Sequence, residues 1–112
     1  MSREYRLYLK DILEAQERIR EYTKKITYRE FAQSNITVDA VIRNLEVIGE
    51  AARKLPPDIK KKSSEIEWRK IVAMRNVLTH EYFGVNTKIV WDVVQNKVEQ
   101  IGIFCRKLLE DM

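Results

Sequence analysis

The 112-residue sequence is 45% hydrophobic and 34% charged, and it contains three Gly and two Pro residues. These proportions are ordinary for a globular protein and leave little room for a turn-rich β fold, and the length predicts one domain over residues 1–112. No stretch approaches the roughly 18 apolar residues of a membrane span, and the charged N-terminus has no apolar signal core. The single cysteine cannot form an intrachain disulfide. A cytoplasmic protein is therefore expected. The net charge of +4 permits an anionic partner without identifying one.

Two long helices are predicted in the first half of the chain. The first runs from about Arg3 to Ile26, because apolar side chains recur there at alternating spacings of three and four residues: Tyr5, Tyr8, Ile12, Ala15, Ile19, Tyr22 and Ile26. The second runs from about Val38 to Leu55 with the same spacing; Thr37 is its predicted N-cap, and Pro56-Pro57 ends it. Residues 27–36 are predicted to be a connector with a short turn near Phe31.

Two further helices are predicted in the second half. After a basic loop at residues 58–62, Ser64 and Glu67 form a capping-box pattern that opens the third helix, which closes near Gly84. The fourth helix starts after Asn86 or Thr87 and carries an unbroken apolar stripe as far as Met112. Three long stripes, one shorter helix and short loops predict an all-α, up-and-down bundle of four to five helices.

Arg75 interrupts the apolar stripe of the third helix. At 100° per residue it falls in the middle of an arc of about 120° formed by Trp68, Ile71, Val72, Leu78 and Tyr82. Because an unpaired buried charge is costly, Arg75 must reach a carboxylate such as Glu46 or Glu50, an aromatic face, the bundle edge or an external anion. His80 lies about 140° round the same helix, so a two-fold axis could combine the side chains of two copies into one composite site.

His80 and Arg75 suit phosphodiester cleavage without a metal ion. His80 is the only histidine, and an imidazole pKa near 6.5 allows it to give or take a proton at neutral pH. The planar guanidinium of Arg75 can hold a phosphate and stabilise developing negative charge, and RNA supplies its own nucleophile, the 2′-OH. From the residues alone, the alternative is structural: a buried salt bridge at Arg75 and a hydrogen-bonded imidazole at His80.

The segment RNVLTHEY, residues 75–82, resembles the R-x4-H-x-Y motif of HepT-like toxins in the HEPN superfamily. The neighbouring segments DAVIRNLEVIGEAARKLP, IEWRKIVAMRN and EYFGVNTKIVW resemble the same family, so the likeness spans nearly the whole chain. It implies a HEPN-like helical bundle that dimerises around the motif helix, and a metal-independent endoribonuclease. It also implies that Arg75 and His80 are catalytic and that Asn76 is the polar residue assisting beside the arginine.

The same resemblance implies a partner and a form of regulation. The partner is a minimal nucleotidyltransferase antitoxin, which in this family transfers AMP from ATP to the motif tyrosine, here Tyr82. An anionic group on Tyr82, on the same helical face as Arg75, would occupy the phosphate clamp and repel RNA. The expected assembly is a homodimer, or a larger complex with the antitoxin.

Other features of the sequence are weaker. Asp39, Arg43, Glu46 and Glu50 form a charged stripe on the second helix, either a solvated face or a cleft wall from which Glu50 or Asp39 orients Arg75 or His80. Lys60, Lys61 and Lys62 could follow an RNA backbone or form a solvated loop. Cys105 lies on an apolar stripe and is expected to be buried and inert. With one His, one Cys and no phosphate-cradling glycine loop, neither a metal nor a cofactor is expected.

Two other functions fit the same residues. In one, the chain is a non-catalytic module that binds nucleotide or substrate for the nucleotidyltransferase, and Arg75 holds a phosphate without cleaving it. In the other, the chain is a plain helical oligomer in which Arg75 forms a structural ion pair, and loss of that pair would destabilise the fold by roughly 3–5 kcal/mol.

Overall fold

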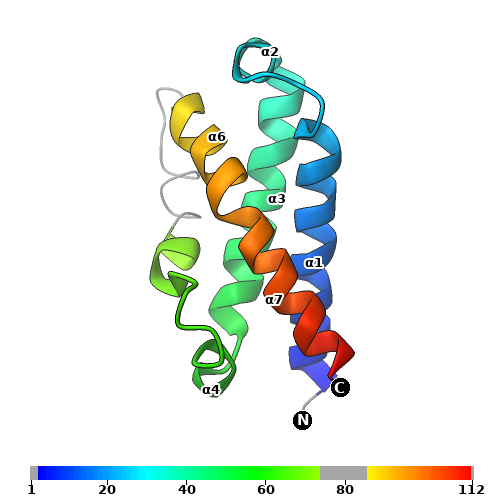
Figure 1. Cartoon of the computed structure of the whole chain (residues 1–112), viewed down its shortest axis with the longest axis vertical. Coiled ribbons are helices and arrows are strands. Elements are labelled where there is room, and N and C mark those ends of the chain that lie inside the picture. The colour runs from blue at the N-terminus through cyan, green and yellow to red at the C-terminus, as the bar shows by residue number, and fades with distance from the viewer. Residues whose placement is uncertain (1–2, 74–85, 112) are drawn as a thin grey trace.

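A computed structural model describes residues 3–73 and 86–111, and it confirms an all-α, up-and-down helical bundle over these residues. The two longest helices, α1 (Arg3–Thr23) and α3 (Asn35–Lys54), lie side by side, and α7 (Val98–Glu110) packs across α1 (Figure 1). The short helices α2 (Tyr28–Gln33) and α4 (Pro57–Lys60) lie at opposite ends, and α6 (Thr87–Asn96) leads into α7. Residues 68–73 are also helical. No described helix is long and apolar enough to cross a membrane.

The core is the meeting of the apolar faces of these helices. The predicted stripe of the second helix is confirmed, because its six members are all buried: Val38, Val41, Leu45, Ile48, Ala52 and Leu55. The α1 stripe is largely confirmed, because Tyr5, Ile12, Ala15 and Ile19 are buried and Leu9, which was expected to widen the stripe, is fully buried. Tyr22, near the end of the helix, is 40% exposed. The helix ends at Thr23, three residues before the predicted end, and the Thr23 hydroxyl donates to the Ile19 carbonyl oxygen at 2.8 Å.

Several predicted boundaries were wrong for local reasons. The N-cap of α3 is Ser34 and not Thr37, and the Ser34 hydroxyl accepts a hydrogen bond from the Thr37 backbone N–H at 3.2 Å. The predicted connector contains α2, which opens on a capping box between Thr27 and Glu30. The predicted prolines do end α3, and Pro57 also starts α4, where its missing N–H costs nothing.

The second half of the chain contains two further corrections. The helix that follows the basic loop begins at residue 68, so Ser64 is not its N-cap, and the backbone oxygen of Glu67 accepts the bond from Ile71 at 3.1 Å. The predicted fourth helix is two helices, because the backbone leaves helical geometry at Lys97, with φ −120° and ψ −38°. Its start is confirmed, since Asn86 caps α6. Its apolar stripe continues across the break through the buried Val94 and Val98.

Candidate functional site

The four motif residues lie outside the described residues. Arg75, Asn76, His80 and Tyr82 all fall between residues 74 and 85, so their predicted roles remain predictions. The structure does describe the chain on both sides of this segment, and it describes Glu50, the predicted supporting acid. These surroundings define where the segment starts and ends on the bundle.

The chain before the motif is anchored by Trp68. Its indole Nε1 donates to the backbone oxygens of Lys60 at 3.1 Å and Ser63 at 3.2 Å, and its ring lies 5.5 Å from the Phe104 ring of α7 in an edge-on arrangement. Ile71, one turn further along, is 4% exposed. The residues that precede Arg75 are therefore held by both packing and directional hydrogen bonds.

An ion-pair cluster at Glu67 joins this segment to the break between α6 and α7. The Glu67 carboxylate lies 2.7 Å from Lys70 Nζ and 2.9 Å from Lys97 Nζ. The hydrogen bonds from Lys70 and then Lys97 lower the pKa of Glu67 from 4.5 to about 2. The same contact raises the pKa of Lys97. The backbone thus leaves helical geometry at Lys97, the residue whose side chain reaches across to Glu67, just before the helical residues 68–73.

The chain after the motif is anchored at the start of α6. Asn86 Oδ1 accepts from the backbone N–H groups of Lys88 at 3.0 Å and Ile89 at 3.3 Å, which satisfies donors that the helix itself leaves open. The Thr87 hydroxyl hydrogen-bonds the Tyr28 hydroxyl of α2 at 2.8 Å. The segment between residues 74 and 85 is therefore bracketed by two well-packed attachment points.

Glu50 is half-buried on α3 and contacts cations of its own helix. Its carboxylate lies 2.7 Å from Arg53 Nη2 and 3.8 Å from Lys54 Nζ. It also lines a shallow groove of about 340 Å³ between α1 and α3, together with Arg43 and Glu46. Among the described residues no ion pair joins Asp39, Arg43 and Glu46 to one another, and the first two are exposed. The charged stripe is therefore largely solvated, with Glu50 at its more buried end.

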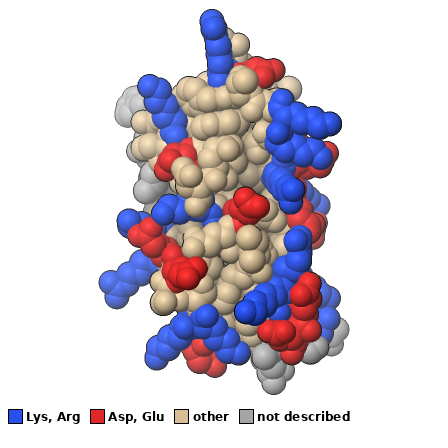
Figure 2. Space-filling view, in the orientation of Figure 1, with Lys and Arg blue, Asp and Glu red and all other residues tan. Residues whose placement is uncertain are grey.

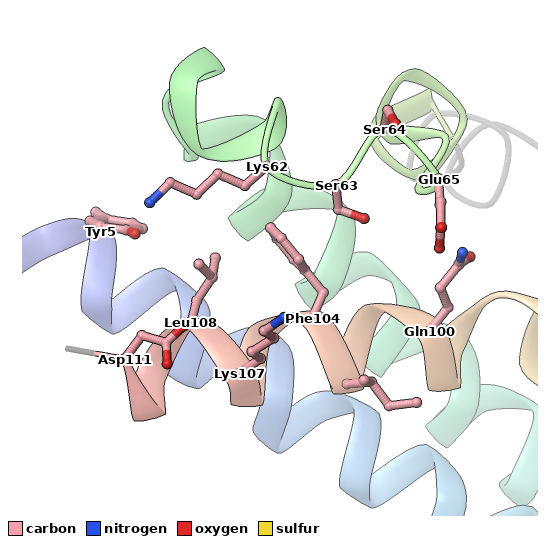
Figure 3. Close-up of a pocket in the computed structure, with 11 residues that line it drawn as sticks. Tyr5, Lys62, Ser63, Ser64, Glu65, Gln100, Phe104, Lys107, Leu108 and Asp111 are labelled. Carbon is pink, nitrogen blue, oxygen red and sulfur yellow. The ribbon is translucent and has the colours of Figure 1, made fainter.

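A second groove lies where the loop at residues 62–65 faces α7, with a volume of about 620 Å³ (Figure 3). Polar side chains from both walls line it, among them Lys62, Ser64, Gln100 and Lys107. Sequence reasoning missed this groove because its walls lie about 40 residues apart along the chain, and no pattern joined the loop to α7. Figure 2 shows that Lys and Arg side chains gather mainly along the edges of this side of the molecule.

The thiol of Cys105 is excluded from chemistry by burial. The side chain is fully buried on α7, as predicted, and desolvation raises the pKa of the thiol to about 12. Within residues 3–73 and 86–111, no group of three or more His, Cys, Asp or Glu side chains is placed to hold a metal ion.

Comparison with known proteins gives a consistent family. A protein named "Probable ribonuclease HepT" from Thermococcus cleftensis is 42% identical over 90% of this chain and 92% of its own. A protein named "Putative RNase MJ0127" from Methanocaldococcus jannaschii is 44% identical over 87% of this chain and 80% of its own.

A third relative is longer than this chain. It is named "Gamma-glutamylcyclotransferase and putative RNase MJ0434", also comes from M. jannaschii, and is 38% identical over the whole chain, which spans half of its length. No solved structure matches. The model of the family described as Ribonuclease HepT-like matches residues 12–108, so the motif at residues 75–82 lies inside the match. The chain therefore belongs to the ribonuclease HepT-like family.

Proposed function

We propose that this chain, a ribonuclease of the HepT-like family, cleaves single-stranded RNA without a metal ion through Arg75 and His80. The observation that carries the proposal is the family match over residues 12–108 together with the R-x4-H-x-Y pattern at residues 75–82 inside it. The pairing of a proton-transfer group with a phosphate clamp at this spacing is the chemical reason for assigning the two residues.

The reaction needs only groups that the motif and the RNA provide. The 2′-OH attacks the adjacent phosphorus as His80 removes its proton, and the bond from phosphorus to the 5′-oxygen of the next nucleotide breaks. The leaving oxygen takes a proton from an imidazolium, either the same His80 or that of a second copy. Arg75 binds the phosphate and stabilises the charge that builds up on it, with Asn76 assisting. The products are a 2′,3′-cyclic phosphate and a 5′-OH.

We further propose that the enzyme is a homodimer and the toxin of a toxin–antitoxin pair. Its partner is a minimal nucleotidyltransferase that transfers AMP from ATP to the Tyr82 hydroxyl and releases pyrophosphate. The added phosphate would compete with RNA for Arg75. Glu50, a half-buried carboxylate on α3, is the acid that we propose supports this chemistry.

Cleavage of RNA in the presence of EDTA tests the catalytic proposal. The parent, checked by intact mass to carry no adduct on Tyr82, should degrade RNA, and His80→Ala should leave it intact. Arg69→Ala is a matched control, because Arg69 is an exposed cation six residues before Arg75 in the sequence. Unchanged cleavage by His80→Ala would remove this residue from the mechanism. Intact RNA with the parent would favour the non-catalytic binding module.

The regulatory proposal has a separate test. Incubation with ATP and the partner transferase should add one adenylyl group to the parent, and Tyr82→Phe should gain no mass. Expression of the chain alone should arrest growth, and co-expression of the transferase should restore it. A mass gain that persists in Tyr82→Phe would place the modification elsewhere.

A further inference from the structure

The groove between the loop at residues 62–65 and α7 has the size and chemistry of a binding site to which no function has yet been assigned. Its volume of about 620 Å³ lies within the range of small-ligand sites. It lies beside the helical residues 68–73 that precede the motif in the sequence, since Trp68 packs directly on Phe104, one of the residues that line the groove. A ligand held here would be close to the segment that leads into Arg75.

Two lysines line the groove from opposite walls. Lys62 belongs to the loop and Lys107 to α7 (Figure 3). Both side chains are exposed, and neither forms an ion pair in the part of the chain that the structure describes. Two other lysines, Lys70 and Lys97, are by contrast both paired with Glu67. The two groove lysines can therefore bind a phosphate without first breaking an ion pair.

An aromatic side chain stands between the two walls. Phe104 is half-buried on α7, and Figure 3 shows it pointing from the helix toward the loop at residues 62–65. Its ring is fixed edge-on against Trp68. A fixed aromatic ring at the wall of a groove is the kind of surface on which nucleobases stack, and such stacking does not depend on which base is present.

The rest of the lining has no cation, and it combines polar side chains with the apolar Ile103 and Leu108. Glu65 and Gln100 point toward one another at one end of the groove (Figure 3), where a carboxylate and an amide can receive the amino and carbonyl groups of a base edge. Asp111 lies at the other end and can accept a hydrogen bond from a ribose hydroxyl. With two lysines and two carboxylates, the groove suits one phosphate with its sugar and base better than a run of phosphates.

We propose that this groove is an accessory subsite for one nucleotide of the single-stranded RNA substrate. Lys62 and Lys107 bind its phosphate and Phe104 stacks on its base. This inference rests on the proposed function, because it takes RNA as the substrate, but it concerns binding and not cleavage. The subsite would hold the strand at a point away from the reacting phosphate and so increase its affinity for the enzyme.

Binding of a labelled single-stranded RNA octamer tests the subsite. Fluorescence anisotropy is measured over a range of NaCl concentrations in a His80→Ala background, which prevents cleavage under the proposed function. Lys62→Ala and Lys107→Ala should each reduce the slope of log K against log salt by about 0.7, which corresponds to about 5-fold weaker binding at 0.1 M salt. Lys61→Ala is the matched control, because Lys61 is an exposed neighbour that does not line the groove.

A third variant tests the stacking wall. Phe104→Leu should weaken RNA binding by at least about 5-fold at all salt concentrations, because stacking is lost but no charge is removed. Since Phe104 also contacts Trp68, its thermal unfolding is measured alongside. The lysine variants alter only exposed side chains and keep the proposal falsifiable if Phe104→Leu fails to fold.

Each other outcome is informative. Equal affinity of Lys61→Ala, Lys62→Ala and Lys107→Ala would overturn the subsite, as would no RNA binding at all. A free mononucleotide that displaces the octamer as effectively as the octamer itself would make the groove a free-nucleotide site. Lysine variants that change the oligomeric state in place of the affinity would make it a protein interface. The parent could also bind RNA without cleaving it. If the groove variants then bind RNA more weakly than the parent, the result would support the subsite and refute the proposed catalysis.

Discussion

Gly102 on α7 lies so close to Gln16 on α1 that a methyl group does not fit between them. A Cβ atom built at Gly102 would be 2.6 Å from both Cδ and Oε1 of Gln16 and 2.8 Å from its Cγ. Gln16 is 6% exposed, so its side chain has little open solvent to move into. An alanine at this position therefore requires the Gln16 side chain to shift.

The expected effect of Gly102→Ala is the balance of two opposing terms. Overpacking of a close contact destabilises by roughly 1–3 kcal/mol. Alanine in place of glycine inside a helix stabilises by about 1 kcal/mol. The free energy of unfolding should therefore fall by between about 0 and 2 kcal/mol. In a Gln16→Ala background the clash is absent, and the same substitution should raise the free energy of unfolding by up to about 1 kcal/mol.

A double-mutant cycle measures this coupling. Urea unfolding of the parent, Gln16→Ala, Gly102→Ala and the double variant, all at one protein concentration, should give a coupling energy of about 1–3 kcal/mol. The change of sign between the two backgrounds is the critical observation. Additive effects within about 0.5 kcal/mol would refute the argument, because they would mean that the two side chains do not compete for the same space.

Three further predictions follow from the core and from the titrating groups. Leu45→Ala should lower the free energy of unfolding, measured in urea, by about 2–5 kcal/mol because Leu45 is fully buried. Ile36→Ala should change it by less than about 0.5 kcal/mol because Ile36 is 84% exposed. Equal losses would contradict the assigned core. Cys105 should not react with a thiol reagent at pH 8 until urea unfolds the chain, since its pKa is about 12, and rapid labelling of the folded protein would show that the site is open. Because the pKa of Glu67 is lowered from 4.5 to about 2, its contribution to stability is present above pH 4.5 and is lost as the pH falls toward 2. Over that pH range Glu67→Gln should therefore lose less thermal stability than the parent. The difference should be small, and salt should reduce it further, because the Glu67 side chain is 43% exposed. Identical pH profiles of the two proteins would show that these ion pairs do not stabilise the fold.

Helix type and core residues could be predicted where apolar spacing alone decides them. On α3 all the residues of the predicted stripe are buried, because that side of the helix packs against the core. On α1 the prediction followed a strict alternation of three and four residues. In a straight helix, residues chosen by this rule shift round the helix axis by about 20° every seven residues. By Tyr22 the predicted line had left the buried face, where Thr23 lies instead, and the polar Gln16 is also buried although no apolar pattern could predict it.

Short-range capping was harder to predict because several polar residues compete for one role. Ser34 and Thr37 are both suitable N-caps, and their hydroxyl oxygens lie 2.8 Å apart, but only Ser34 precedes the first helical turn. The break at Lys97 has no Gly or Pro to signal it. Its side chain reaches Glu67, 30 residues away, and a partner so distant cannot be predicted from the local sequence.

The candidate site divides in the same way. The motif at residues 75–82 is contiguous, so the sequence alone brings its residues together and family membership supports the assignment. The groove at Phe104 joins residues from the loop at 62–65 with α7, and no spacing along the chain predicts that meeting. Contiguous sites can be found by pattern, whereas sites assembled by packing need coordinates.

The two tryptophans report on opposite ends of the bundle. Trp68 hydrogen-bonds the Lys60 oxygen of α4 and packs against Phe104, and Trp91 lies beside α2, where its ring centroid is 5.1 Å from that of Phe31. Replacing either one with phenylalanine leaves a single tryptophan, which can be excited selectively over the five tyrosines, at a known end. Emission from the two single-tryptophan proteins can then show whether the ends melt at the same denaturant concentration, as a cooperative two-state transition requires. The same Trp68 signal, at the wall of the groove, offers an optical readout of occupancy without any attached dye.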